Sequence, residues 1–206
     1  VLEDADLDEA VKAAAFGAFM NHGQICMSTE RIILVDAIAD AFCDRFAAKV
    51  ATMPTGDPRQ DGAPLGAVVD MRTVTHVNAL IADALAKGAV LRSGGPAENV
   101  LMPATVIDRV SKGMAIYGDE SFGPVVAIIR VRDEEDAVRV ANDSDYGLSA
   151  AVFTRDAARG LAVAREGEVA DRLALVPQRR EERLELEGDL LVRHGRAADG
   201  SNGRGL

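Results

Sequence analysis

Residues 19–35 read FMNHGQICMSTERIILV, so a helical pattern passes into a strand pattern across one short loop. The run at 31–35 is apolar and rich in β-branched residues, which is typical of a buried strand. Cys26 lies on the loop between the two patterns. We expect this loop at the carboxyl edge of a sheet layer, where open α/β sheets place their chemistry.

Helical and strand patterns alternate on both sides of this stretch. Helix-spaced apolar residues and short apolar runs follow each other as far as residue 165. The expected helices span residues 7–21, 36–51, 70–87, 133–142 and 156–165. The expected strands span residues 31–35, 89–92, 101–106, 124–131 and 148–154. This order predicts an α/β protein with an open parallel sheet and helices on both faces.

The two ends of the chain differ from this pattern. Residues 1–6 resemble the end of a buried strand, with Asp4 and Asp6 as candidate N-caps of the helix that follows. Residues 166–206 lack Lys, Ile, Phe, Tyr, Met and Thr, and are dominated by Arg, Glu and Leu. We therefore expect one domain over 1–165 and a divergent tail over 166–206 that is partly disordered or helical.

Composition excludes several classes of partner. The chain has 206 residues, 48% of them hydrophobic, and a formal net charge of −10. No basic stripe is available to pair with phosphates, so neither nucleic acid nor an anionic membrane is an expected partner. Two cysteines make no disulfide framework, and nothing resembles a secretory signal or a membrane span. We expect a reduced, cytoplasmic protein.

The residues alone leave the role of Cys26 open. Three interpretations are open: a buried structural cysteine, a nucleophile, or half of a Cys–His dyad with His22 that would serve an acyl hydrolase. Gly23 stands between the two and is expected to break the helix that would align them. A metal site is disfavoured, because the three histidines show no ligand spacing with either cysteine. Cys43 lies beside an apolar helix face and is expected to be a buried small hydrophobe.

Several blocks resemble the aldehyde dehydrogenase superfamily. Gly-Gln-Ile-Cys at 23–26 resembles the Gly-Gln-x-Cys signature that carries the nucleophile in that family. Glu-Ser-Phe-Gly-Pro at 120–124 resembles its Glu-x-Phe-Gly-Pro motif, and 141–156 resembles its following helix-to-strand segment. The blocks occur in the family's order over residues 1–165. The resemblance identifies this range as the catalytic domain, with 1–6 as a remnant of the preceding cofactor-binding domain.

This resemblance implies a reaction and a set of roles. The family oxidises aldehydes to carboxylic acids with NAD or NADP, through a thiohemiacetal and then a thioester on the cysteine, here Cys26. Glu120 would bind the nicotinamide ribose hydroxyls, and Phe122 would pack beside the nicotinamide. The side chains expected to face the aldehyde are Met20, Ile25 and Met27. The Cys-Met-Ser-Thr-Glu-Arg run is most like the vanillin, salicylaldehyde and benzaldehyde branch, which favours an aromatic aldehyde.

Parts of the family pattern are missing. The Glu-Leu-Gly-Gly-Lys block with the general base, and the Asn that binds the oxyanion, are expected ahead of Val1. The resemblance also stops near residue 165, which suggests a reading-frame shift in the tail. We therefore expect the isolated chain to be inactive, whereas full-length members are expected to be homo-oligomers. A non-catalytic remnant, or a module that docks on a longer relative, is the alternative.

Overall fold

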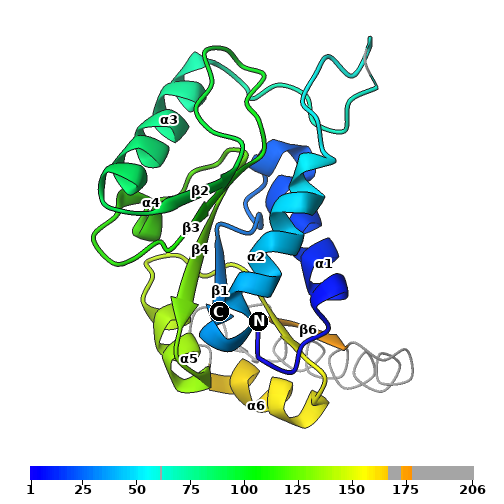
Figure 1. Ribbon diagram of the computed structural model, residues 1–206, viewed down its shortest axis with the longest axis vertical. Coiled ribbons are helices and arrows are strands. Elements are labelled where there is room, and N and C mark those ends of the chain that lie inside the picture. The colour runs from blue at the N-terminus through cyan, green and yellow to red at the C-terminus, as the bar shows by residue number, and fades with distance from the viewer. Residues whose placement is uncertain (61, 167–172, 178–206) are drawn as a thin grey trace, which may run out of the picture.

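The computed structural model describes residues 1–60, 62–166 and 173–177. Its larger sheet has four strands in the order β1-β4-β3-β2. The strands are β1 (Arg31–Val35), β2 (Val90–Ser93), β3 (Thr105–Asp108) and β4 (Val125–Val131). The smaller sheet pairs β5 (Ala150–Thr154) with β6 (Leu173–Pro177). Figure 1 shows both sheets and the helices that cover them.

The larger sheet is parallel except at one edge. β1 pairs in parallel with β4, from Arg31 opposite Ala127 to Val35 opposite Val131, and β3 also runs parallel to β4. β2 runs antiparallel to β3, which corrects the expectation of a wholly parallel sheet. The physical reason lies in the connection. No helix separates β2 from β3, and antiparallel neighbours need no crossover helix, whereas parallel ones do.

Six α-helices accompany the strands among the described residues. They are α1 (Leu7–Phe19), α2 (Asp36–Ala51), α3 (Met71–Ala86), α4 (Ala115–Gly118), α5 (Glu134–Asn142) and α6 (Ala157–Glu166). The predicted bounds of β1 and α2 are confirmed to the residue. Asp133 is confirmed as the N-cap of α5, because its side chain accepts a hydrogen bond from the backbone N–H of Asp136.

The sheet buries both of its faces, so helices lie on either side as predicted. Alternate residues of β4 point to opposite faces, as a pleated strand requires. The β4 residues that pack with α1 and α2 are Val126 and Ile128. Those that pack with α3, α4 and α5 are Val125, Ala127, Ile129 and Val131. Figure 1 shows α1 and α2 on one side of the strands and α3 and α4 on the other.

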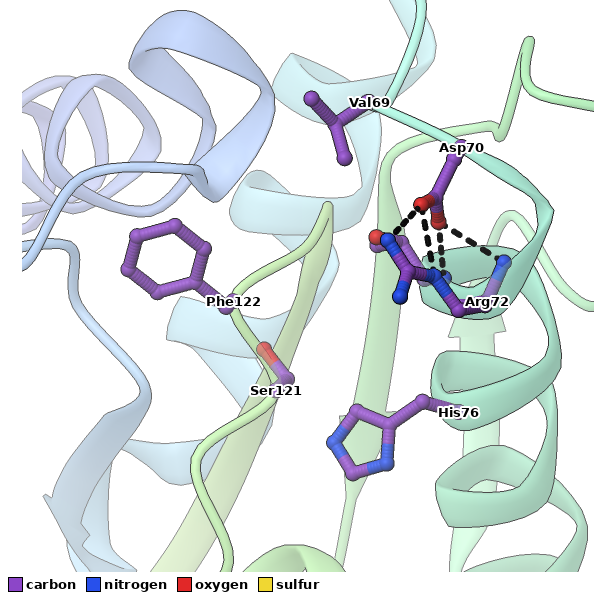
Figure 2. Close-up of a pocket in the computed structure, with 7 residues that line it drawn as sticks. Val69, Asp70, Arg72, His76, Ser121 and Phe122 are labelled. Atoms are coloured by element: carbon purple, nitrogen blue, oxygen red, sulfur yellow. Dashed lines mark hydrogen bonds and ion pairs between the residues drawn. The ribbon is translucent and has the colours of Figure 1, made fainter.

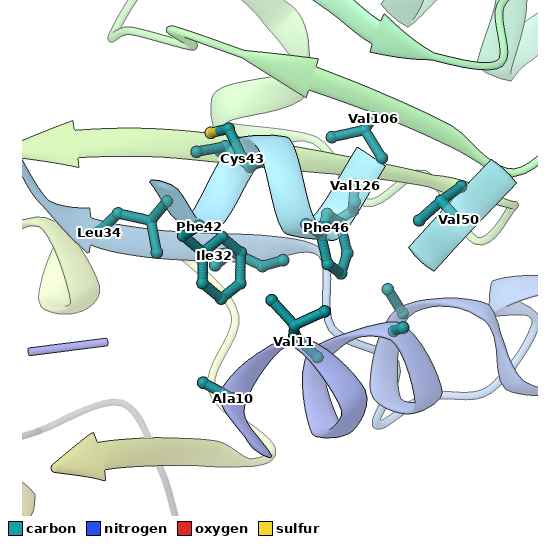
Figure 3. Packing of buried hydrophobic residues seen from close by; sticks show 14 of the residues in the cluster. Ala10, Val11, Ile32, Leu34, Phe42, Cys43, Phe46, Val50, Val106 and Val126 are labelled. Atoms are coloured by element: carbon teal, nitrogen blue, oxygen red, sulfur yellow. The ribbon is translucent and has the colours of Figure 1, made fainter. Parts of the chain in front are cut away.

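The core beneath α1 and α2 combines small residues with stacked rings. α1 buries alanines, among them Ala10 and Ala14, which let the helix approach its neighbours closely. The rings of Phe42 and Phe46 stack at a centroid distance of 5.4 Å, and Phe19 stacks on Phe46 at 6.2 Å. Figure 3 shows this cluster between α1, α2 and the strands. The packing fixes the carboxyl end of α1, from which the Cys26 loop departs.

Several element boundaries differ from prediction by one or more residues, and two of the differences have a clear physical reason. α1 ends at Phe19 rather than residue 21, because Asn21 and His22 adopt left-handed φ values of 48° and 62° inside a 3₁₀ turn, η1 (Met20–Gly23). β3 begins at Thr105, whereas a strand was expected from residue 101. Pro103 lacks the N–H that a ladder needs, so pairing starts only after it.

Residues 1 and 2 are not assigned as strand, but their backbones link the two sheets. The N–H of Val35 donates to Val1 O at 3.3 Å, and the N–H of Leu2 donates to Phe153 O at 3.0 Å. These residues therefore lie between β1 and β5. Asp6 is confirmed as the N-cap of α1. Asp4 is not a cap, because its carboxylate accepts hydrogen bonds from the Thr154 hydroxyl and the Arg155 N–H.

The tail is described only in part. Strand β6 falls inside the range 166–206 that we expected to be divergent and partly disordered or helical. Residues 167–172 and 178–206 of this range lie outside the described residues. The division into a domain over 1–165 and a tail stays a prediction.

Candidate functional site

The Cys26 loop connects η1 to β1 at the amino edge of the larger sheet. A chain that leaves a helix for a strand must enter that strand at its amino end, so the expectation of the carboxyl edge was wrong. β4 is parallel to β1, and the segment that precedes β4 therefore reaches the same edge. The thiol of Cys26 is exposed, which overturns the interpretation of a buried structural cysteine.

Two close backbone contacts hold this loop. A Cβ on Gly17 would meet the hydroxyl oxygen of Thr29 at 2.6 Å, and the N–H of Thr29 donates to Gly17 O at 3.0 Å. Gly23 has a φ of 72°, and a Cβ there would overlap the carbonyl oxygen of Gly123. Only glycine permits these approaches without strain. The loop is thus packed against α1 at one end and against the segment before β4 at the other.

The side chain of Gln24 makes a third connection. Its carbonyl oxygen accepts a hydrogen bond from the N–H of Val69 at 2.8 Å, and its amide lies 3.5 Å from Ala67 O. The carboxamide of Asn21 donates to Gln24 O at 3.2 Å. These bonds tie the Cys26 loop to the residues that precede α3, and they give the Gln of the Gly-Gln-x-Cys signature a structural role.

Glu30 makes the fourth connection, which the sequence did not reveal. One carboxylate oxygen accepts a hydrogen bond from the N–H of Ser121 and the other accepts one from the N–H of Phe122, each at 3.2 Å. Burial raises the pKa of Glu30, while the bonds from Ser121 and Phe122 oppose that rise. The segment that carries Glu120 and Phe122 is therefore fastened to the residue that ends the Cys26 loop.

The predicted cofactor residues lie on that segment, beside a shallow hollow. Phe122 has a φ of 47° and is 43% exposed, and Glu120 is exposed. The hollow has a volume of about 380 Å³. Its lining residues are Val69, Asp70, Arg72, Thr73, His76, Ser121 and Phe122. Figure 2 shows Ser121 and Phe122 on the segment across the hollow from the first turns of α3, with the Phe122 ring directed away from that helix.

α3 contributes residues to this hollow that the sequence analysis missed. Asp70 caps the helix by accepting hydrogen bonds from the N–H groups of Arg72 and Thr73. His76 reaches across, with Nε2 2.9 Å from Glu120 O, and so holds the backbone of Glu120. Arg72 and Thr73 precede His76 by four and three residues, and this spacing on one helix face could have suggested a shared site.

The predicted substrate residues expose apolar surface on η1 and on the Cys26 loop. Met20 is 45% exposed, Met27 is 61% exposed, and Ile25 is half-buried. None of the three carries a charge. Exposed apolar side chains beside an exposed thiol suit a substrate with an apolar body, although the role of these residues stays a prediction.

His22 does not form the alternative dyad. Its ring is 3% exposed, and Nε2 lies 3.0 Å from Met102 O, which can only accept a hydrogen bond. Nδ1 finds no partner within the described part of the chain, so neither ring nitrogen bonds to Cys26. Burial lowers the pKa of His22, which disfavours the charged form. The acyl hydrolase that depends on this dyad loses its base.

Cys43 is buried, as predicted. Burial raises its pKa to about 11, so the thiol stays protonated at neutral pH. Among the residues that the structure describes, no group of three His, Cys, Asp or Glu side chains could hold a metal ion. No helix in those same residues is both long and apolar enough to cross a membrane.

The comparison with protein families is decisive. The model of the aldehyde dehydrogenase family matches residues 1–172, which cover most of the chain. The chain belongs to the aldehyde dehydrogenase family. The predicted resemblance is thereby confirmed, and the match extends a few residues beyond the point at which we expected it to stop.

Individual relatives agree with the predicted branch. A vanillin dehydrogenase from Pseudomonas fluorescens is 51% identical over 168 residues, which are 82% of this chain and 35% of that protein. The crystal structure of a salicylaldehyde dehydrogenase from Pseudomonas putida G7, complexed with salicylaldehyde, superposes with a TM-score of 0.82 at 44% identity. The superposed part covers 85% of this chain and 36% of the salicylaldehyde dehydrogenase chain.

A third member of the aldehyde dehydrogenase family is a NAD-dependent benzaldehyde dehydrogenase from Corynebacterium glutamicum. Its crystal structure superposes with a TM-score of 0.80 at 35% identity, over 90% of this chain and 40% of its own. The chain thus spans about a third of the length of the curated relatives that it matches.

Proposed function

We propose that this chain contributes the nucleophile of an NAD- or NADP-dependent dehydrogenase that oxidises an aromatic aldehyde to a carboxylic acid. The observation that carries the proposal is the position of Cys26. Its exposed thiol lies on a loop that Gly23 and Glu30 fasten to the segment of Glu120 and Phe122. Relatives named for vanillin, salicylaldehyde and benzaldehyde support the aromatic substrate.

The chemistry of Cys26 follows from sulfur. Its thiolate attacks the aldehyde carbon, a C–S bond forms, and the carbonyl oxygen takes up the electron pair as an oxyanion. Loss of hydride from that carbon leaves a thioester, which water then hydrolyses to the acid and the free thiol. When bound, NAD or NADP supplies the acceptor for the hydride. The residues of this chain hold and orient the reacting groups.

The surroundings of Cys26 fit these groups. The hollow beside Phe122 has one aromatic side chain at its edge and the polar groups of Thr73 and His76 across from it, which suits a ring attached to a hydroxylated sugar. Glu120 supplies an exposed carboxylate next to it for the ribose hydroxyls. The exposed methionines give the aldehyde an apolar wall.

Activity is tested in a chimaera. Residues 1–165 replace the matching segment of the Pseudomonas fluorescens vanillin dehydrogenase, and NADH formation with vanillin and benzaldehyde is recorded. We expect turnover in the chimaera, and a loss of at least a thousandfold in its Cys26→Ser variant, while Cys43→Ser retains activity. Turnover that survives Cys26→Ser contradicts the proposal.

The isolated chain is proposed to be inactive, because it spans only 35% of that relative. The 206-residue chain is incubated with benzaldehyde and NAD, and we expect no NADH. Turnover at a rate that Cys26→Ser abolishes would show that this chain alone suffices for the reaction.

A further inference from the structure

Glu30 lies where the Cys26 loop becomes strand. Its carbonyl oxygen accepts a hydrogen bond from the N–H of Ala127 at 3.0 Å, which is part of the pairing between β1 and β4. The backbone of Glu30 is therefore fixed by the sheet. Its side chain crosses to the segment before β4, where it is only partly exposed. Because the backbone cannot shift, the length and charge of this side chain determine where that segment rests.

The carboxylate stabilises a backbone conformation that is unfavourable by itself. Phe122 has a φ of 47°, a left-handed conformation that is sterically strained for a residue with a Cβ. Two successive N–H groups in such a turn form a concave site for an anion. Those of Ser121 and Phe122 each donate to one oxygen of Glu30. Hydrogen bonds to an ionised acceptor are about twice as strong as neutral ones, so the pair offsets the strain.

The contact at Glu30 acts together with the one at Gly23. Gly23 packs on Gly123 three residues before Cys26, and Glu30 binds Ser121 and Phe122 four residues after it. The loop that carries the thiol is thus fastened to the Phe122 segment on both sides. The contact at Gly23 is steric, whereas the contact at Glu30 consists of two hydrogen bonds to a side-chain carboxylate. Only the second contact can be altered without changing the backbone.

We propose that Glu30 is a positioning residue that sets the place of Phe122 relative to Cys26. The proposal rests on the proposed function, in which Phe122 packs beside the nicotinamide and Cys26 holds the substrate. Hydride transfer needs reacting atoms within about 3–3.5 Å, and a displacement of 1 Å can cost about a hundredfold in rate. The Glu30 carboxylate holds the Cys26 loop and the Phe122 segment in one relative position, as hydride transfer requires.

The first test measures hydrogen exchange of individual amides by NMR in the full 206-residue chain. Glu30→Gln keeps the size but leaves one acceptor oxygen for two N–H groups, so exchange at Ser121 and Phe122 should accelerate at least tenfold. Glu30→Asp keeps the charge on a shorter arm and should restore part of the protection. Glu98→Gln, which removes an exposed charge elsewhere, should change neither amide.

The amides of β4 show whether the variants fold. They should stay protected in all three variants, because their ladder does not involve the Glu30 carboxylate. Unchanged exchange at Ser121 and Phe122 in Glu30→Gln overturns the proposal. Equal acceleration there and throughout β4 also overturns it, since that result would mean general destabilisation.

The second test asks whether the geometry around the thiol changes. The rate at which phenyl vinyl ketone alkylates Cys26 is divided by the rate for acrylamide. A change in thiol ionisation affects both rates equally and therefore cancels in this ratio. In Glu30→Gln we expect this ratio to fall at least threefold, because the position of the Phe122 segment relative to the thiol is no longer fixed. An unchanged ratio overturns the positioning role. Labelling that survives Cys26→Ser instead contradicts the proposed function, and leaves the amide result standing.

Discussion

The backbone of Gly23 packs directly on the carbonyl group of Gly123, in the segment that precedes β4. The two residues are a hundred positions apart in the sequence, yet a single Cβ on Gly23 would overlap the oxygen of Gly123. Gly23 also has a φ of 72°, which L-residues rarely adopt. This contact brings the Gly-Gln-Ile-Cys block at 23–26 and the Glu-Ser-Phe-Gly-Pro block at 120–124 together.

Gly23→Ala should therefore destabilise the chain. The left-handed conformation costs about 1–2 kcal/mol, and the overlap with a backbone oxygen adds to it, so we expect a loss of at least about 2 kcal/mol in the free energy of unfolding. Urea unfolding followed by circular dichroism measures the loss. Gly118→Ala is the matched control, because a Cβ there meets open space and should cost less than about 0.5 kcal/mol. Equal stability of the two variants would refute the steric argument.

The two cysteines should differ in reactivity. Cys26 is exposed, whereas Cys43 is buried with a pKa raised to about 11 by that burial. Titration with a chromogenic disulfide reagent at pH 7.5 should show one fast thiol in the folded chain and two in urea. Cys26→Ser should remove the fast phase, and Cys43→Ser should leave it intact. Two fast thiols in the folded chain would mean that the core around Cys43 opens readily.

Local signals explain which parts of the fold were predictable. The run at 31–35 and the helix at 36–51 carry their own apolar patterns, and Asp133 caps α5 through its own side chain. Such features depend on neighbours within a few residues. The direction of β2 depends instead on which strand it meets, and nothing within residues 90–93 records that choice.

The candidate site divides in the same way. Cys26, Glu120 and Phe122 belong to motifs that can be recognised one at a time. The carboxylate of Glu30 could not be assigned from sequence, because its partners lie about ninety residues away. His22 shows the converse case, since its proximity to Cys26 in the sequence left a dyad open as an alternative. The left-handed turn at His22 directs the ring to Met102 O instead.

Arg31 should anchor the end of α5 to the start of β1. Its guanidinium donates to Val140 O, Ala141 O and Asp143 O at 3.1–3.2 Å, and lies 5.6 Å from the ring centroid of Tyr117. A lysine carries the same charge on one nitrogen and cannot reach three separate carbonyls in this fork geometry. Arg31→Lys should therefore cost about 2 kcal/mol in the free energy of unfolding.

Urea unfolding measures this cost, and Arg45→Lys serves as the control. Arg45 is exposed, and within the part of the chain that the structure describes its ion pair is with Asp8, so its replacement should change stability by less than about 0.5 kcal/mol. Hydrogen exchange adds a local readout, because the last turn of α5 loses its cap in Arg31→Lys and should exchange faster than β4. If Arg31→Lys and Arg45→Lys unfold at the same urea concentration, the fork of hydrogen bonds at Arg31 contributes no more than an ordinary surface ion pair.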